Sequence, residues 1–443
     1  MRIAMADVRP FRAIRYDVAK VGDASAIIAP PYDVISAELQ SKLHERHPNN
    51  AIRLVLPDPA KTHPKGKDEY DSAKLYFEDW INTGVLKQDQ EGSYYLVSED
   101  FKYRGAWTRW GLLAAVKLEE YDAKIILPHE STLDGPKKEQ YSLLETCEAN
   151  LSPVFSCYFD PENDIIGSLR ESAAKTPDLE AEEHDGVIVR MWKISGKKVV
   201  NHVREAFEDK PLYIADGHHR YETCLAYKRR MLERHPNETE APWNRTLMYL
   251  CEFNDPALAI MPYHRAIRHL KGMNPHEFIR ALEVLFNIKR IELNPWRGGE
   301  ETRTKAANLL SEAGREGPAF ELVMTEDNNV YLLTPKKEAM RLLDDFPDAL
   351  RSLDIVVLHR LAFEEVLEIH EEDLRAGKVI LYDTDYRAIW QAIRKKGWAA
   401  AFFINPIKPE QVKNVAEAGL IMPQKSTYFY PKITSGLVFH RFI

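Results

Sequence analysis

The sequence is poor in cysteine, since only four of its 443 residues are of this type. The four are widely spaced and form no Cys-x-x-Cys pair, so neither a zinc site nor a dithiol site has support. Cys157 and Cys251 stand among apolar residues, where we expect them to pack as small hydrophobic side chains. From this pattern we expect the cysteines to pack in the protein interior, without a role in redox chemistry or metal binding.

Long apolar runs and an excess of positive charge are also missing. No run approaches the roughly 18 residues that cross a bilayer, and residues 1–7 lack the apolar core of a signal peptide. The formal net charge of −8 argues against non-specific nucleic-acid binding as the main activity. We therefore expect a cytoplasmic protein with no membrane and no nucleic-acid partner. Its oligomeric state is left open, a homo-oligomer included.

The remaining composition is that of an ordinary globular protein, with 44% hydrophobic and 29% charged residues. The length suits about two or three domains, or one domain with large insertions. Short apolar runs alternate with helical periodicities, which predicts an α+β fold. We expect an N-terminal α+β region at residues 1–118, a central region at 119–268 that holds the densest motifs, and a C-terminal α/β region at 269–443.

One turn carries an unusual density of reactive side chains. Residues 212–215 form a short apolar run typical of a buried strand, and helical spacing resumes at Tyr221. The turn between them consists of Asp216, Gly217, His218, His219 and Arg220. Backbone N–H groups at a helix start attract anions, and the imidazoles and the guanidinium would add donors. We therefore predict an anion site here, with Asp216 holding a metal ion or orienting a histidine.

A second strand and polar turn occupy residues 125–138. His129 and Glu130 stand where the apolar run ends, and Thr132 and Lys137 follow closely. Glu130 could cap a helix or pair with Lys137, which would be a structural role. A carboxylate beside a histidine after a buried strand is also what general-base chemistry requires.

Two further segments allow a structural and a functional interpretation. Pro30 and Pro31 restrict the backbone before Tyr32 and Asp33, so these residues form a rigid turn or the rim of a site. The pair at residues 264–265, His-Arg, is either solvated surface or a second positive contribution to the site.

A third segment lies near the C-terminus. Lys425, Ser426 and Thr427 form a compact cationic and hydroxyl group that could hold phosphate or carboxylate. The alternative is a loop packed by Tyr428 and Phe429.

With these motifs in view, the chain resembles a conserved, largely uncharacterised prokaryotic family known only as a domain of unknown function. The motifs that carry the resemblance are A-P-P-Y-D-V (29–34), L-P-H-E-S-T (127–132), N-L-S-P (150–153), A-D-G-H-H-R-Y-E-T (215–223) and M-P-Q-K-S-T (422–427). They span almost the whole chain in the expected order. Members of that family are often encoded beside serine-biosynthesis enzymes.

A looser resemblance covers residues 120–265. The Asp-Gly-His-His-Arg turn is similar to the phosphate-binding turn of the ParB/sulfiredoxin-like superfamily, which includes sulfiredoxin, the ParB nucleotidase and free-serine kinases. The resemblance implies a mixed-sheet core of that type with large insertions. In the kinases a His-Glu pair supplies a catalytic glutamate, and His129 and Glu130 match it. The spacing from Glu130 to Asp216 is longer than in compact members, so the segment between them would be an insertion.

This resemblance implies a nucleotide-dependent phosphotransferase that acts on a small hydroxyl-bearing molecule such as free L-serine, with ATP or ADP and Mg²⁺ as cofactors. The implied catalytic residues are Glu130, as acceptor of the hydroxyl proton, Asp216, which would also bind the metal, and His218. The implied phosphate-binding residues are Gly217, His218, His219, Arg220 and Thr223. The implied substrate-binding residues are His129, Thr132, Tyr32, Asp33, Lys425 and Ser426.

Other functions fit the same residues. A nucleotide or phosphoester hydrolase would use water as the acceptor, and a non-catalytic regulator would bind a nucleotide or amino acid without turnover. A ParB-like DNA adaptor is the weakest alternative, because the chain is acidic and has no recognisable helix-turn-helix. A transition-metal site at Asp216, His218 and His219 is disfavoured because adjacent histidines seldom bind one ion together.

Overall fold

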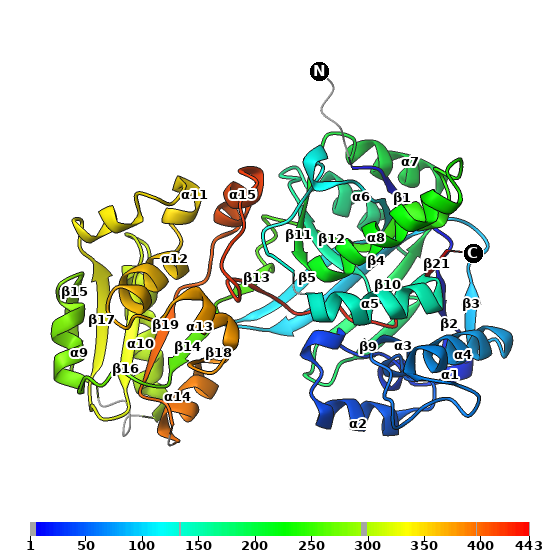
Figure 1. Cartoon of the computed structure of the whole chain (residues 1–443). Coiled ribbons are helices and arrows are strands. Elements are labelled where there is room, and N and C mark those ends of the chain that lie inside the picture. The colour runs from blue at the N-terminus through cyan, green and yellow to red at the C-terminus, as the bar shows by residue number, and fades with distance from the viewer. Residues whose placement is uncertain (1–5, 133, 294–298, 396, 443) are drawn as a thin grey trace. The chain divides into compact units, whose positions relative to one another are not determined.

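The structure, a computed structural model, describes residues 6–132, 134–293, 299–395 and 397–442, so Leu133 in the second motif lies outside it. The chain divides into two compact units. Unit 1 comprises residues 1–259 and 429–443, and unit 2 comprises residues 260–428. Both units combine helices with sheets (Figure 1), which confirms the predicted α+β fold. The chain crosses between the units within β13 (Ala259–Met261) and β20 (Tyr428–Tyr430).

Unit 1 is built on a mixed nine-stranded sheet with the order β6-β11-β8-β12-β5-β4-β10-β9, and β1 pairs with β5. The strands of this sheet are β1 (Val8–Arg9), β4 (Tyr94–Lys102), β5 (Ala106–Lys117), β6 (Ile126–Leu127), β8 (Val154–Tyr158), β9 (Leu179–Glu182), β10 (Ile188–Ile194), β11 (Leu212–Asp216) and β12 (Arg245–Glu252). The smaller strands are β2 (Ile14–Tyr16), β3 (Leu86–Gln88), β7 (Ala149–Asn150) and β21 (His440–Arg441). Strands from residues 1–118 and from residues 119–268 therefore share one sheet.

Helices surround this sheet. They are α1 (Val18–Val21), α2 (Ala37–Arg46), α3 (Ile52–Val55), α4 (Glu69–Asn82), α5 (Asp134–Cys147), α6 (Asp164–Ser172), α7 (Lys197–Ala206) and α8 (His218–Arg234). Side chains alternate along each strand, so Val154 and Tyr158 of β8 join a core that also contains Leu169 of α6, Val203 of α7 and Tyr221 of α8. This packing places the start of α8 directly after the buried strand β11, as the sequence predicts.

The opposite face of the sheet contains a fully buried ion pair. Arg109 Nε donates to Glu99 Oε2 at 2.8 Å, and the Tyr249 hydroxyl donates to the same oxygen at 2.8 Å. Arg109 is 0% and Glu99 1% exposed. Arg109 Nη2 also donates to the carbonyl of Pro431 at 2.7 Å. The pair therefore links the central strands to the last residues of the chain.

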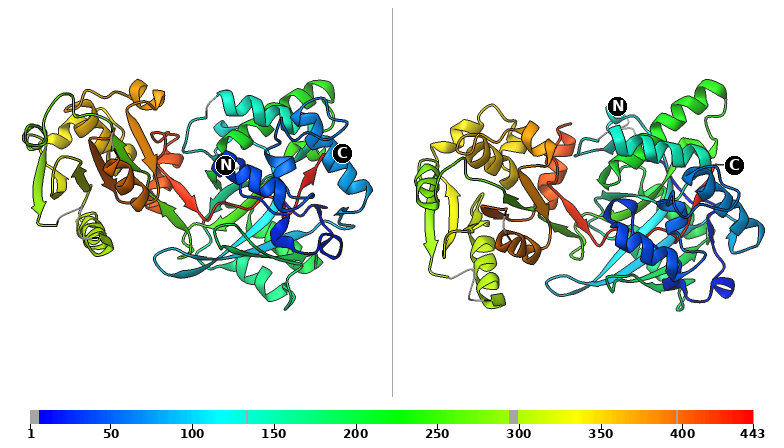
Figure 2. Two further views of the ribbon diagram at one scale, coloured as in Figure 1. Left: turned by 90° about the horizontal axis from the view of Figure 1, so that it is seen from below. Right: turned by 60° about the horizontal axis from the view of Figure 1, so that its bottom comes forward.

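Those last residues, 429–443, form a C-terminal segment that runs through unit 1, as the red trace in Figure 2 shows. Its backbone bonds to N-terminal strands and loops: Ser435 N–H donates to the Ala29 carbonyl at 2.8 Å and Phe439 N–H to the Ile14 carbonyl at 2.8 Å. The Ser435 hydroxyl lies 2.7 Å from that of Ser152. The C-terminal segment is thus an integral part of unit 1, although unit 2 precedes it in the sequence.

Unit 2 contains a six-stranded sheet with the order β15-β17-β16-β19-β14-β18. Its strands are β14 (His264–Ile267), β15 (Phe286–Ile291), β16 (Phe320–Met324), β17 (Val330–Pro335), β18 (Ile380–Asp383) and β19 (Ala400–Ile404). Its helices are α9 (Pro275–Leu282), α10 (Gly299–Ala313), α11 (Asp348–Arg351), α12 (Asp354–Leu358), α13 (Glu371–Ala376), α14 (Tyr386–Arg394) and α15 (Pro409–Glu417). A π-helical turn, His359–Glu364, continues α12.

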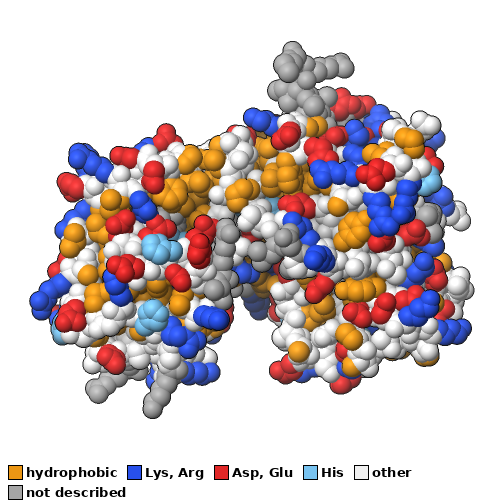
Figure 3. Space-filling view, viewed as in Figure 1, with side chains coloured by type: hydrophobic (Ala, Val, Ile, Leu, Met, Phe, Trp, Pro, Cys, Tyr) orange, Lys and Arg blue, Asp and Glu red, His pale blue; other side chains and the backbone are white. Residues whose placement is uncertain are grey.

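Among the described residues, the structure has no helix that is both long and apolar enough for a membrane span. Acidic and basic side chains are interspersed over the face of the molecule seen in Figure 3.

The buried pair makes a stability prediction. The change Glu99→Ala leaves the Arg109 guanidinium buried without its carboxylate, and we expect unit 1 to lose about 3–5 kcal/mol of unfolding free energy, measured by urea denaturation. The double change Glu99→Leu with Arg109→Met removes both charges and should cost much less. A loss below about 1 kcal/mol for Glu99→Ala, within the range of an exposed pair, would contradict this role.

Candidate functional site

The turn between β11 and α8 depends on glycine. Gly217 has φ +89° and ψ 29°, a left-handed conformation in which a side chain is strained. A Cβ atom there would also lie 2.9 Å from Nε and Nη2 of Arg220. Glycine therefore allows both the sharp turn and the close approach of the guanidinium to the backbone.

Asp216 ends β11 between two cations. Its Oδ2 accepts from Arg220 Nη2 at 2.6 Å, and its Oδ1 accepts from Lys432 Nζ of the C-terminal segment. Burial by itself would raise the pKa of Asp216, but the charges of Lys432 and Arg220 outweigh it and lower the pKa below its ordinary value. Asp216 is therefore a carboxylate at neutral pH, and both of its oxygens already hold a cation.

Arg220 ties this turn to the N-L-S-P motif. Its Nη1 donates to the carbonyl of Pro153, and the side chain is 8% exposed. Its Nε has no hydrogen-bond partner among the described residues. A cavity of about 30 Å³, lined among others by Ser152, Arg220 and Thr223, adjoins it and has room for about one water molecule.

His129 and His218 meet as a buried pair of imidazoles. The His129 backbone N–H donates to His218 Nε2 at 3.3 Å, and the two rings lie edge to face with centroids 4.9 Å apart. Burial lowers the pKa of His129 to about 4 and, with the neighbouring His129, lowers the pKa of His218 well below its ordinary value. Both rings are therefore neutral at pH 7, and the accepting Nε2 assigns the His218 proton to Nδ1.

The segment after His129 is anchored to the first turns of α8 through Glu222. Glu222 Oε2 accepts from the Thr132 hydroxyl at 2.6 Å and lies 3.4 Å from Lys137 Nζ. The Thr223 hydroxyl bonds back to the His219 carbonyl at 2.6 Å. His219 is half-buried, and burial lowers its pKa. The structure thus brings together the two motifs that the sequence separates by about 85 residues.

Tyr32 and Asp33 lie in a short 3₁₀ turn, Tyr32–Val34. The charges of Arg220 and Asp216 affect the pKa values of both side chains. Asp33 keeps more than a third of its surface accessible, yet the surrounding protein desolvates it enough to raise its pKa, and the charge of Asp216 adds to this effect. Burial raises the pKa of Tyr32 to about 12, while Arg220 opposes this shift. Asp33 therefore lies near enough to Asp216 for the charge of Asp216 to act on it.

Three further residues that the sequence predicts for the site are Glu130, Lys425 and Ser426. Glu130 is half-buried between β6 and α5, next to His129 in the chain. Lys425 and Ser426 belong to unit 2, where the Ser426 hydroxyl donates to the Pro423 carbonyl at 2.5 Å. Their roles stay predictions.

Lys432 and Glu222 are the members of the cluster that sequence reasoning missed. Glu222 stands inside a motif, so its position was a signal. Lys432 is 216 residues away from Asp216, in a segment of prolines and tyrosines where no local pattern distinguishes a site lysine.

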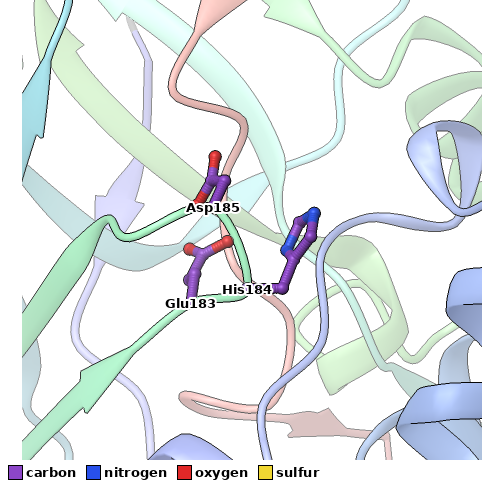
Figure 4. Close-up of side chains that lie close together, drawn as sticks. All are labelled: Glu183, His184 and Asp185. Carbon is purple, nitrogen blue, oxygen red and sulfur yellow. The ribbon is translucent and has the colours of Figure 1, made fainter.

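A separate group of possible metal ligands lies in the turn between β9 and β10. Glu183, His184 and Asp185 each place one ligand atom within 4.8 Å of the others (Figure 4). The buried Glu183 carboxylate accepts from the Thr434 hydroxyl of the C-terminal segment, and burial raises its pKa well above the ordinary value. We interpret Glu183 as an anchor for that segment, because His184 and Asp185 are exposed.

Comparison with known proteins gives one family and several distant structures. A family model described as "Protein of unknown function (DUF1015)" matches residues 8–356. No curated protein matches the chain. A free serine kinase in complex with AMP is 13% identical, with 72% of this chain and 86% of that chain covered and a TM-score of 0.32.

Two further solved structures are similarly distant. A conserved hypothetical protein from Pyrococcus furiosus is 13% identical over 73% of this chain and 92% of its own, with a TM-score of 0.32. SbnI with a C-terminal truncation, from Staphylococcus aureus, is 10% identical over 74% and 86%, with a TM-score of 0.34. TM-scores this low do not establish a shared fold, so the function must be argued from the site.

From the ion pairs of Asp216 we predict that the change Lys432→Met lowers the unfolding free energy by an amount that depends on pH. At pH 6–8 the variant should lose about 1.5–3 kcal/mol of unfolding free energy, since one charged hydrogen bond is removed. The lowered pKa of Asp216 contributes stability that is present above its unfolded pKa and lost as the pH falls through its folded pKa. The difference from the wild-type protein should therefore shrink below about pH 4.

Thermal unfolding across this pH range would measure the effect. The control is Lys87→Met, which removes an exposed lysine paired with Asp17. A difference between Lys432→Met and the wild-type protein that stays constant down to pH 3 would contradict the assignment.

Proposed function

Since the chain belongs to the DUF1015 family, whose description assigns no activity, we propose a function from the site itself: a nucleotide-dependent phosphotransferase that acts on a small hydroxyl-bearing molecule. The observation that carries the proposal is the convergence of Asp33, His218, Asp216 and Lys432 at the start of α8. They come from three parts of the chain that are far apart in sequence.

The start of α8 suits phosphate groups. α8 extends over 17 residues, and the start of such a helix directs backbone N–H groups and the positive end of the helix dipole toward a bound anion. Lys432 and Arg220 add positive charge that Asp216 holds in place. Phosphoryl transfer needs charge neutralisation and exact positioning more than covalent chemistry. In this function the backbone from Gly217 to Arg220, with the half-buried His219, holds the phosphates of ATP or ADP.

Glu130 supplies the base in this proposal. It directly follows His129, whose backbone N–H bonds to His218 Nε2, so one hydrogen bond couples its position to the phosphate-binding turn. Removal of the hydroxyl proton requires a general base within hydrogen-bond reach of the acceptor, and a carboxylate can act as this base. Thr132, fixed on Glu222, and Tyr32 border the acceptor, for which free L-serine is the first compound to test.

The donor set fits a magnesium ion at Asp33. Two carboxylates, Asp33 and Asp216, are near enough for the charge of one to raise the pKa of the other, and a divalent cation relieves such repulsion. Mg²⁺ prefers one or two carboxylates together with phosphate oxygens. Because both oxygens of Asp216 hold cations, Asp33 is the better ligand. When bound, the ion would neutralise phosphate charge.

The direct test incubates the full-length protein with ATP or ADP and Mg²⁺, with and without L-serine and other small hydroxy compounds, and measures phosphorylated product and free phosphate separately. Acceptor-dependent product supports the proposal. Phosphate release that needs no acceptor would identify a hydrolase. Thermal stabilisation by nucleotide without turnover would identify a regulator. Either of the last two results overturns the phosphotransferase.

The change Glu130→Gln should lower kcat by about 10²–10⁴-fold, the usual contribution of a general base, while the Kd for the nucleotide stays unchanged. The measurement is steady-state kinetics with calorimetric binding of ADP. Glu171→Gln, which alters an exposed carboxylate on α6, is the matched control. Turnover at the wild-type rate in Glu130→Gln would exclude Glu130 as the base.

The change Asp33→Asn should weaken the Mg²⁺-dependent part of ADP binding by at least about tenfold, a typical effect of disturbing a metal site. Binding of ADP without Mg²⁺ should be unchanged or stronger, since a negative charge is removed. Titration of Mg²⁺ at fixed ADP measures both. Equal Mg²⁺ dependence in Asp33→Asn and in the control Asp122→Asn, an exposed carboxylate, would show that Asp33 is no ligand.

A further inference from the structure

Unit 2 contains a guanidinium with no solvent-accessible surface. Arg265 is the second residue of β14, an inner strand between β18 and β19, and is 0% exposed. Its guanidinium carbon lies 5.3 Å from the ring centre of Tyr382 on β18. Burying a cation is costly unless an anion or several hydrogen bonds compensate.

The described partners of Arg265 are all uncharged. Its Nη1 donates to the Tyr263 carbonyl and its Nη2 to the Lys425 carbonyl at 3.0 Å. Its Nε has no partner, and no carboxylate pairs with it, within the described part of the chain. Burial lowers the pKa of Arg265 to about 10, and only the Tyr382 hydroxyl acts in the opposite direction. A fully buried positive charge therefore has no counter-charge, unlike Arg109 of unit 1.

A histidine on the same face of the sheet also has a buried nitrogen without a described hydrogen-bond partner. Arg265 pairs in register with Phe402 of β19, so their side chains share a face. The ring of Phe402 contacts the ring of Phe363. The ring of His359 stacks on Phe363, with the two ring centroids 5.2 Å apart. His359 Nε2 is buried without a partner in the described residues. Burial, and then the charge of Arg265, lowers the pKa of His359 well below its ordinary value, so the ring is neutral and within the range at which the charge of the guanidinium acts on it.

The same guanidinium holds the M-P-Q-K-S-T loop. Lys425, whose carbonyl accepts from Arg265, has φ +57°, an uncommon conformation for a residue with a side chain. Its Nζ lies 5.2 Å from the ring centre of Tyr263. Arg265 therefore joins two segments of unit 2 that the sequence marks separately, residues 264–265 and 425–427. The second segment also contains a second cation, Lys425.

We infer that unit 2 contains an oxyanion site in which Arg265 Nε and His359 Nε2 donate to a carboxylate or phosphate group of a small ligand, with Lys425 as an auxiliary cation. One oxyanion would satisfy both unpaired nitrogens and the uncompensated charge, and the guanidinium geometry suits either group. π-Helical turns such as the one that begins at His359 occur frequently at functional sites. The inference uses no residue of the α8 turn and does not depend on the proposed phosphotransferase.

The test follows the His359 ring in the full-length protein labelled with ¹⁵N-histidine. Inorganic phosphate and acetate are titrated separately at constant ionic strength, with sodium chloride as the reference salt. We expect a saturable shift of the His359 signals with at least one of the two anions, and the tighter one identifies the phosphate or the carboxylate as the group bound. No shift with either anion would overturn the inference.

Variants separate binding from a purely structural role. Arg265→Met should weaken the anion Kd by about 10–100-fold, as expected for a lost charged hydrogen bond. Arg265→Lys keeps the charge and should weaken the Kd less, which covers the case in which Arg265→Met does not fold. The matched control is Arg268→Met, because Arg268 is exposed and stacks on Trp398. A wild-type response in Arg265→Met and Arg265→Lys would refute the site.

Discussion

The Asp216 carboxylate, held between Arg220 and Lys432, is the constraint on which the candidate site depends. A buried carboxylate is tolerated only when cations and hydrogen bonds compensate it. Here the compensation also fixes geometry: Arg220 lies against Gly217 and reaches the Pro153 carbonyl. The start of α8, the N-L-S-P motif and the C-terminal segment are thereby held in one arrangement around a single charge.

The C-terminal segment explains why a site near the middle of the sequence requires the end of the chain. Besides Lys432, it contributes the Pro431 carbonyl to Arg109 and the Thr434 hydroxyl to Glu183. Each contact satisfies a buried polar group that would otherwise be costly. Unit 1 is consequently closed by residues that follow unit 2 in the sequence, so its site and its core share the same polar network.

The two units differ in whether their buried charged side chains have a counter-charge. In unit 1, Arg109 and Asp216 are each matched by an opposite charge, and the neutral His129 and His218 pack edge to face against each other. In unit 2, the described surroundings of Arg265 provide only carbonyls and an aromatic ring. A buried charge with a counter-charge is compensated, whereas a buried charge without one is retained at a cost in free energy, which is why we infer a ligand for the second arrangement.

Local pattern determined much of this protein by itself. The apolar run at 212–215, the glycine after it and the helical spacing that follows predicted β11, the turn and α8, because strand and helix periodicity and the backbone freedom of glycine are properties of adjacent residues. The density of charged and imidazole side chains marked the same turn. Only the tertiary structure decided that Asp216 binds Lys432 and that Arg265 is buried without a counter-charge. Both depend on which distant segments fold against each strand, and no local spacing encodes a contact across 216 residues.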